Sequence, residues 1–108
     1  MKTKLRTDEQ LIKEGSANLQ KGIETVGGNL CLTNQRLIFE ASKGNVQGGV
    51  TEFELSTIQA TRPCWTKFLG FIPIMPNSLA VFTKQGKEYR FVLFGRQAWA
   101  TAIDAQIK

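Results

Sequence analysis

Two apolar runs joined by a short polar turn occupy residues 28–40, near the middle of the chain. Successive side chains of a strand point to opposite faces, so a hairpin in this stretch pairs Leu32 with Leu37 and Leu30 with Phe39 and places all four on one face. The opposite face would carry Asn29, Cys31, Thr33, Arg36, Ile38 and Glu40. A slip of one residue would scatter the apolar groups over both faces, so the pattern predicts this register as well as the two strands.

The turn of this hairpin is predicted at Asn34-Gln35. Asn tolerates a positive φ, which favours the primed turn that matches the twist of the flanking strands. We therefore expect Thr33 and Arg36 to be cross-strand neighbours.

The segment before the hairpin admits two structures. Residues 11–19 fit a first strand with a bulge at Gly15. A short helix is the alternative, because Leu11 and Ile12 are adjacent instead of alternating with polar residues.

The segment after the hairpin predicts two more strands. Strict alternation covers residues 50–55, and a second run covers 58–63, where Pro63 either ends the strand or restricts it to a sheet edge. Residues 64–76 are rich in large apolar groups, but their prolines exclude a regular helix. This last segment is also far too short to span a bilayer.

A final hairpin is predicted from strands at 79–83 and 88–93 around a Gln85-Gly86 turn. That turn gives the two strands an inner face made of Ala80, Phe82, Tyr89, Phe91 and Leu93. A helix beginning at 95–96 follows, and residues spaced by three and four form its apolar stripe: Trp99, Ala102, Ile103, Gln106 and Ile107. Such a stripe must cover a core. These patterns predict a mainly β fold, a curved and nearly closed antiparallel sheet whose open end the C-terminal helix plugs.

The composition lacks most of the residue types on which enzyme active sites depend. The 108 residues have the length of one domain and contain no histidine, which is the commonest general base and metal ligand. The two cysteines, Cys31 and Cys64, are 33 positions apart, which matches no redox motif or zinc site. We predict a non-enzymatic protein without cofactor or metal. Its location is predicted to be cytoplasmic, because the basic amino end is not followed by the apolar stretch of a secretory signal.

The net charge of +5 is unevenly distributed. Residues 60–96 carry six basic side chains against one acid, Glu88, whereas the first 59 residues balance seven bases with seven acids. A localised basic surface indicates an anionic partner.

The stretch Gly-Gly-Asn-Leu-Cys-Leu-Thr-Asn-Gln-Arg-Leu-Ile-Phe-Glu at 27–40 resembles the signature hairpin of GRAM domains, small modules with a pleckstrin-homology-like (PH-like) barrel. The resemblance to bacterial GRAM-like proteins continues through 69–73, 84–91 and 95–99 and covers nearly the whole chain. It implies a single domain over 1–108, with about seven strands in a barrel capped by the helix. It also implies binding of membrane lipids or proteins instead of catalysis.

In that fold, three loops meet at one mouth of the barrel, away from the helix. The resemblance therefore implies a site for an anionic surface formed by Lys21, Lys43, Lys84 and Lys87. The alternative is that these lysines only solvate loop tips. PH domains that bind phosphoinositides typically place further basic residues on the strand after the first loop, where this chain offers Asn29, Cys31 and Thr33.

Two classes of function follow. The first is a module that binds an anionic membrane lipid surface, peripherally at the inner membrane face, or a protein partner. Trp65, Phe68 and Phe71 would add apolar contacts if exposed, and are otherwise buried or cover a partner-binding groove. The alternative is a small nucleic-acid-binding β-barrel, in which these aromatic residues and Tyr89 stack on bases. The predicted core position of Tyr89 counts against that alternative.

Overall fold

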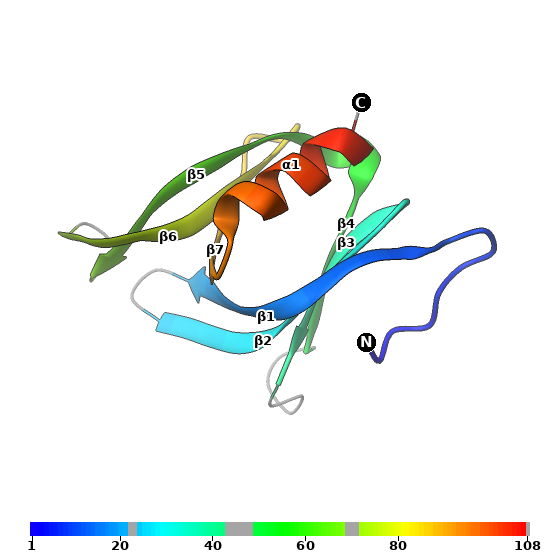
Figure 1. Ribbon diagram of the computed structural model, residues 1–108, viewed down its shortest axis with the longest axis horizontal. Helices are drawn as coiled ribbons and strands as arrows, with labels where there is room; N and C mark the ends of the chain where they lie inside the picture. Colours follow the sequence, from blue (N-terminus) through cyan, green and yellow to red (C-terminus); the bar gives the residue numbers. More distant parts are fainter. Residues whose placement is uncertain (22–23, 43–48, 69–71, 108) are drawn as a thin grey trace.

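The computed structural model describes residues 1–21, 24–42, 49–68 and 72–107, and for residues 21, 24, 65–68 and 72–76 only the backbone. The elements in chain order are β1 (Leu11–Lys21), β2 (Glu24–Thr33), β3 (Arg36–Ala41), β4 (Val50–Glu54), the short 3-10 helix η1 (Leu55–Thr57), β5 (Ile58–Phe68), β6 (Ile72–Thr83), β7 (Glu88–Leu93) and α1 (Arg96–Gln106). The strands form one antiparallel sheet in the order β4-β3-β2-β1-β7-β6-β5. The mainly β fold with one C-terminal helix is therefore confirmed (Figure 1).

The curved sheet encloses one hydrophobic core, and α1 lies beside β5 and β6 (Figure 1). The Phe39 and Phe91 rings, 5.7 Å apart, join the two halves of the sheet through this core. Trp99 and Ile103 of α1 are buried in the same cluster. The apolar stripe of the helix thus covers the core, as predicted.

The central hairpin has the predicted register. Leu32 pairs with Leu37 and Leu30 with Phe39, and all four side chains are buried in the core. The predicted primed turn is wrong because it requires a positive φ at Asn34. In the described part of the chain, Asp8 is the one non-glycine residue with a positive φ. The Thr33 hydroxyl holds the turn instead, accepting N–H bonds from Gln35 at 3.0 Å and Arg36 at 2.8 Å.

Residues 11–19 belong to a strand, and the alternative of a short helix is wrong. The predicted bulge at Gly15 is also wrong, because Gly15 pairs regularly with Leu30 and the register shifts between Leu11 and Lys13. An extra residue at Ile12 explains why two apolar residues are adjacent there. Pro63 lies in β5, the edge strand of the sheet, and residues 64–68 and 72–76 extend the β5–β6 hairpin.

The last hairpin is shifted by one residue from its predicted register. Leu79 pairs with Phe91 and Val81 with Tyr89. Thr83 and Lys87 close the turn, because the backbone N–H of Thr83 donates a hydrogen bond of 2.9 Å to the Lys87 carbonyl. Three residues, not two, form the loop, and its last residue, Gly86, has a left-handed φ of 88°, as three-residue hairpin loops with a bulge require. The shift turns Leu79 and Val81 into the core and turns Ala80 and Phe82, predicted to point inward, to the outside of the barrel.

Residues 1–10, here called the arm, double back from the start of β1 (Figure 1). The Glu40 carboxylate accepts the backbone N–H groups of Lys2 at 2.8 Å and Thr3 at 2.6 Å, which fixes the arm to β3. As a result the second face of the β2–β3 hairpin is covered, and Cys31 and Ile38 are fully buried. This layer was not predicted from the sequence.

Candidate functional site

The predicted lysine site is described only in part. Lys84 and Lys87 are both exposed and lie in the β6–β7 turn. The backbone N–H of Lys84 donates a hydrogen bond of 2.9 Å to the Thr57 carbonyl, which attaches this turn to η1. Lys21 is the last residue of β1, but its side chain lies outside the described part of the structure, and Lys43 lies outside the described residues altogether. The four-lysine site therefore stays a prediction.

The β6–β7 turn borders a groove of about 390 Å³ in which carboxylates face the turn. Gln85 and Lys87 line it from one side, and Glu52 and Glu54 of β4 line it from the other. Both carboxylates are paired with other bases, Glu52 with Arg36 and Glu54 with Arg6. Two lysines in one exposed turn by themselves make a modest anion site.

The predicted apolar contacts cannot be placed. Trp65 and Phe68 belong to β5, but their side chains lie outside the described part, and Phe71 lies outside the described residues. A different aromatic residue is exposed: 95% of Phe94 is accessible to solvent. The sequence contained a signal for it, because Tyr89, Phe91 and Leu93 alternate into the core and the residues between them must point outward.

Tyr89 also bears on the nucleic-acid alternative. Its ring packs edge-on against Phe53 with 4.6 Å between the ring centroids, and it is half-buried against the core. A ring held in this way is not a platform on which a base stacks.

Two bases of residues 60–96, Arg62 and Arg90, lie on one surface, the outside of β5, β6 and β7. Its residues lie in three rows across the strands: Ala60, Phe82 and Glu88; Arg62, Ala80 and Arg90; Cys64, Ser78 and Val92. We call this surface the basic face. The Arg62 guanidinium lies over the Phe82 ring, 5.4 Å from its centroid, and Arg90 pairs with Glu88 at 2.6 Å. At the start of α1, Arg96 donates a hydrogen bond of 2.6 Å to the Cys64 carbonyl.

In the other half of the molecule, several charges of the arm and β1–β4 pair with one another. Arg36 pairs with Glu9 at 2.7 Å and with Glu52 at 3.1 Å, and Arg6 pairs with Glu54. The terminal ammonium of Met1 pairs with Glu14 at 2.7 Å. These contacts leave the positive excess on the half that holds the basic face.

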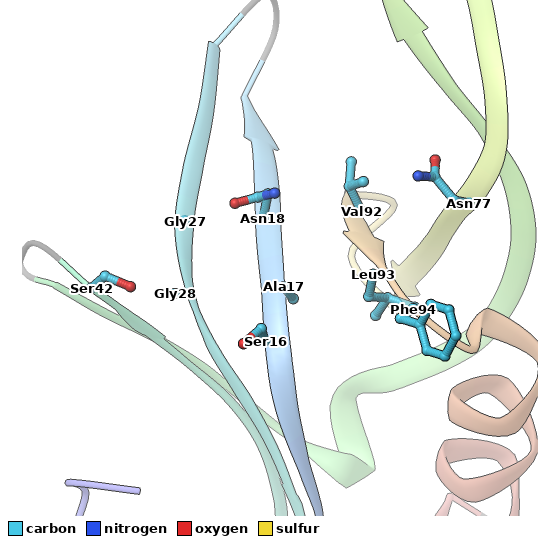
Figure 2. Close-up of a pocket in the computed structure, with 10 residues that line it drawn as sticks. All are labelled: Ser16, Ala17, Asn18, Gly27, Gly28, Ser42, Asn77, Val92, Leu93 and Phe94. Carbon is cyan, nitrogen blue, oxygen red and sulfur yellow. The ribbon is translucent and has the colours of Figure 1, made fainter.

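A second groove, of about 690 Å³, runs beside the basic face (Figure 2). Uncharged residues line it: Ser16, Ala17, Asn18, Gly27, Gly28, Ser42, Asn77, Val92, Leu93 and Phe94. Figure 2 shows the exposed Phe94 ring at the end of β7, on the side of the groove opposite β2.

Two features of the described residues bear on metal binding and on thiol chemistry. They contain no group of three His, Cys, Asp or Glu side chains placed to hold a metal ion. Burial raises the pKa of the Cys31 thiol to about 12, so this cysteine stays protonated and unreactive. In the same part of the chain, α1 is too short to cross a bilayer as a helix.

A model of the GRAM domain family matches residues 1–106, which is almost the whole chain. The chain belongs to the GRAM domain family. No curated protein matched the sequence. GRAM and PH-like domains typically bind lipids or proteins, and generally do so without catalysis.

Solved structures similar to this GRAM domain include PH domains. The Vps36 N-terminal PH domain is 19% identical, with a TM-score of 0.70 over 95% of this chain and 82% of that one. The C-terminal domain of an unknown protein from Leishmania infantum is 16% identical, with a TM-score of 0.73 over 94% and 88%. The linker-DH/PH fragment of p115-RhoGEF is 14% identical, with a TM-score of 0.70 over 94% of this chain but 30% of that one. At these identities the similarity shows the PH-like fold.

Proposed function

We propose that this GRAM domain is a non-enzymatic module that associates with anionic membrane surfaces through its positively charged half. The observation that carries the proposal is the separation of charge. Residues 1–59 balance seven bases with seven acids, several of them joined in ion pairs within the arm and β1–β4, whereas residues 60–96 hold six bases against Glu88. A surface of one sign attracts a surface of the other over about one Debye length.

A membrane fits this distribution better than a small anion does. The described bases of the second half are spread over a sheet face and a turn and do not converge on one cavity. An anionic leaflet is itself spread out, and each Lys or Arg near it contributes about 1 kcal/mol. The proposed location is cytoplasmic and peripheral, at the inner face of the membrane, where anionic lipids produce a negative surface potential.

Sedimentation with lipid vesicles tests this function. Wild-type protein is mixed at low ionic strength with vesicles of phosphatidylcholine, alone or with phosphatidylserine, and the pelleted fraction is measured. We expect pelleting with the anionic vesicles only. Lys84→Glu with Lys87→Glu should weaken it strongly, because two attractive charges become repulsive. Lys2→Glu with Lys4→Glu, on the exposed arm, makes the same change in net charge and should have much less effect.

The decisive contrary result is an absence of wild-type pelleting with anionic vesicles at low ionic strength. Equal pelleting with neutral vesicles would be equally contrary, because it would show that charge is not the attraction. The first result would leave a protein partner as the better function for this domain, and the second would replace charge by apolar contact as the attraction to the membrane.

A further inference from the structure

We propose that the membrane contact of this domain is the basic face together with Phe94, so that the domain lies on the bilayer on its β5–β6–β7 side instead of standing on the loops at the barrel mouth. This inference rests on the proposed function and names the side chains that meet the lipid. It replaces the turn lysines as the centre of the contact.

Two arginines form the centre of this surface. Arg62 and Arg90 lie on either side of Ala80 in one row of the sheet, so their backbones are about 10 Å apart. Ala80 is small and almost fully buried, so no side chain of this row protrudes between the arginines. Two arginines on neighbouring sides of one strand can both meet phosphates or carboxylates of a flat anionic surface, and Arg is suited to such contacts because it donates through two parallel N–H groups.

The surroundings hold Arg62 in a fixed place without covering it. Its guanidinium lies over the Phe82 ring, 5.4 Å from the centroid, a cation–π contact that holds the charged group near the sheet surface. The residue is exposed. Pre-ordering of this kind lowers the entropy lost when an anion binds.

The opposing charges near this surface are few. Glu88 lies in the neighbouring row and pairs with Arg90 at 2.6 Å, which lowers the contribution of Arg90 and leaves Arg62 as the stronger contact. On the adjacent helix, Asp104 accepts the hydroxyl of Thr61 at 2.9 Å. Lys84 and Lys87 at one end of the surface and Arg96 at the other keep the local charge positive.

Phe94 supplies an apolar contact next to the basic face, at the end of β7, where it is 95% exposed. A single exposed aromatic residue needs no explanation by itself. Here, however, it follows β7 directly, where Arg90 and Val92 point away from the core, and Val92 and Phe94 line the same groove (Figure 2). Basic side chains beside an exposed aromatic ring combine attraction to headgroups with burial of apolar surface at the acyl boundary, as interfacial membrane-binding elements do.

The same surface fits nucleic acid poorly. Binding of single strands requires several aromatic platforms on which successive bases stack. Among the described side chains of the basic face, Phe82 is covered by Arg62, which leaves the neighbouring Phe94 as an open ring. A bilayer needs only one such ring to insert.

Vesicle sedimentation with single variants tests this orientation. Arg62→Glu should lower partition into phosphatidylserine-containing vesicles by at least about tenfold at low ionic strength, and this difference should vanish near 1 M salt. Arg62→Gln, which keeps the polar stem without the reversal, should lower it by about fivefold. Phe94→Ala should lower it by roughly tenfold, and salt should change that factor little because the lost term is apolar burial. Lys4→Glu is the charge-matched control on the arm and should stay close to wild type.

Thermal denaturation is the folding control. The melting temperature of each variant must lie well above the assay temperature. The orientation is overturned if wild type pellets with anionic vesicles while Arg62→Glu and Phe94→Ala pellet as wild type does, because the proposed function then stands with a different contact surface. Failure of wild type itself to pellet overturns the proposed function together with this inference. Binding of a labelled single-stranded oligonucleotide that is lost in Arg62→Glu, without vesicle binding, would assign the surface to nucleic acid instead.

Discussion

Arg36 and Glu9 form a doubly hydrogen-bonded ion pair beneath the arm, with 2.8 Å from Nε to Oε2 and 2.7 Å from Nη2 to Oε1. The Arg36 side chain is 5% exposed and that of Glu9 is 0% exposed. The same carboxylate accepts the Thr33 hydroxyl at 2.6 Å and the backbone N–H of Arg6 at 2.7 Å. One acidic residue of the arm thus binds the turn of the central hairpin, which makes the arm part of the folded structure.

Loss of this pair should destabilise the protein severely. Arg36→Ala leaves the Glu9 carboxylate buried without its cation, and breaking a buried pair from one side costs about 3–5 kcal/mol. Urea denaturation gives the free energy of unfolding. Arg6→Ala is the control, because the Arg6–Glu54 pair is more than 40% exposed on both sides, and surface pairs contribute little. Equal losses in the two variants would contradict the account of the arm.

The same contacts predict a decrease of stability in acid. Hydrogen bonds from Arg36 lower the pKa of Glu9 from 4.5 to about 2. Burial alone would raise the pKa of Glu40, but hydrogen bonds from Thr3 and from the backbone N–H of Lys2 outweigh it and lower that pKa. A carboxylate with a lowered folded-state pKa stabilises the fold fully above its unfolded pKa, and this stabilisation is lost as the pH falls through the folded value.

We therefore expect the free energy of unfolding to decrease as the pH falls from about 5 toward 2. Denaturation curves recorded across this interval check the expectation. Glu9→Gln should start from a lower stability at pH 7 and show a shallower decrease, because it no longer has this group to titrate. An unchanged slope in Glu9→Gln would mean that other carboxylates cause the acid sensitivity.

Gly28 should tolerate no side chain. A Cβ there would overlap the backbone oxygen of Glu40 and come within 2.7 Å of Cζ of Phe39, so Gly28→Ala should cost about 1–3 kcal/mol through overpacking. Gly27→Ala is the matched control, since its Cβ would meet only the Asn18 side-chain oxygen, at 3.0 Å, which can rotate away. Calorimetric melting temperatures compare the two. A Gly27→Ala variant at least as destabilised as Gly28→Ala would refute this assignment.

Trp99 should anchor the helix to the barrel. It is 3% exposed and packs in the core cluster, so Trp99→Ala should cost about 3–5 kcal/mol, as large core truncations do. Phe94→Ala, five residues earlier but almost fully exposed, should change stability by less than about 0.5 kcal/mol. Chemical denaturation of both variants measures the difference. A midpoint of Trp99→Ala near that of wild type would show that the helix is not packed as described.

The sequence predicted the central hairpin because four large apolar residues fit only one register. It misplaced the final hairpin by one residue because two-residue and three-residue loops are both compatible with Gly86, and the choice reverses every side chain of β6. The arm was missed for another reason. Its contacts are polar, and Glu9 and Arg36 are 27 residues apart in the chain. Hydrophobic periodicity therefore cannot reveal these contacts.

The candidate site was predicted unevenly. The excess of positive charge in residues 60–96 could be counted from the sequence. The alternation along β7 also predicted that Arg90 points outward. The pairing of Arg62 with Ala80, and of Ala80 with Arg90, needed the correct β6 register. The loop lysines came from resemblance to the family, and of these the structure describes the side chains of Lys84 and Lys87.

The most direct test of the central claim is the partition of wild-type protein into anionic vesicles as a function of ionic strength. If charge on the β5–β7 half drives binding, partition should be strong near 0.01 M salt, where the Debye length is about 30 Å, and mostly lost near 1 M, where it is about 3 Å. Neutral vesicles should bind little at either limit. Partition that does not change with salt, or that is absent at the lowest ionic strength, would contradict the claim that this domain binds anionic membranes.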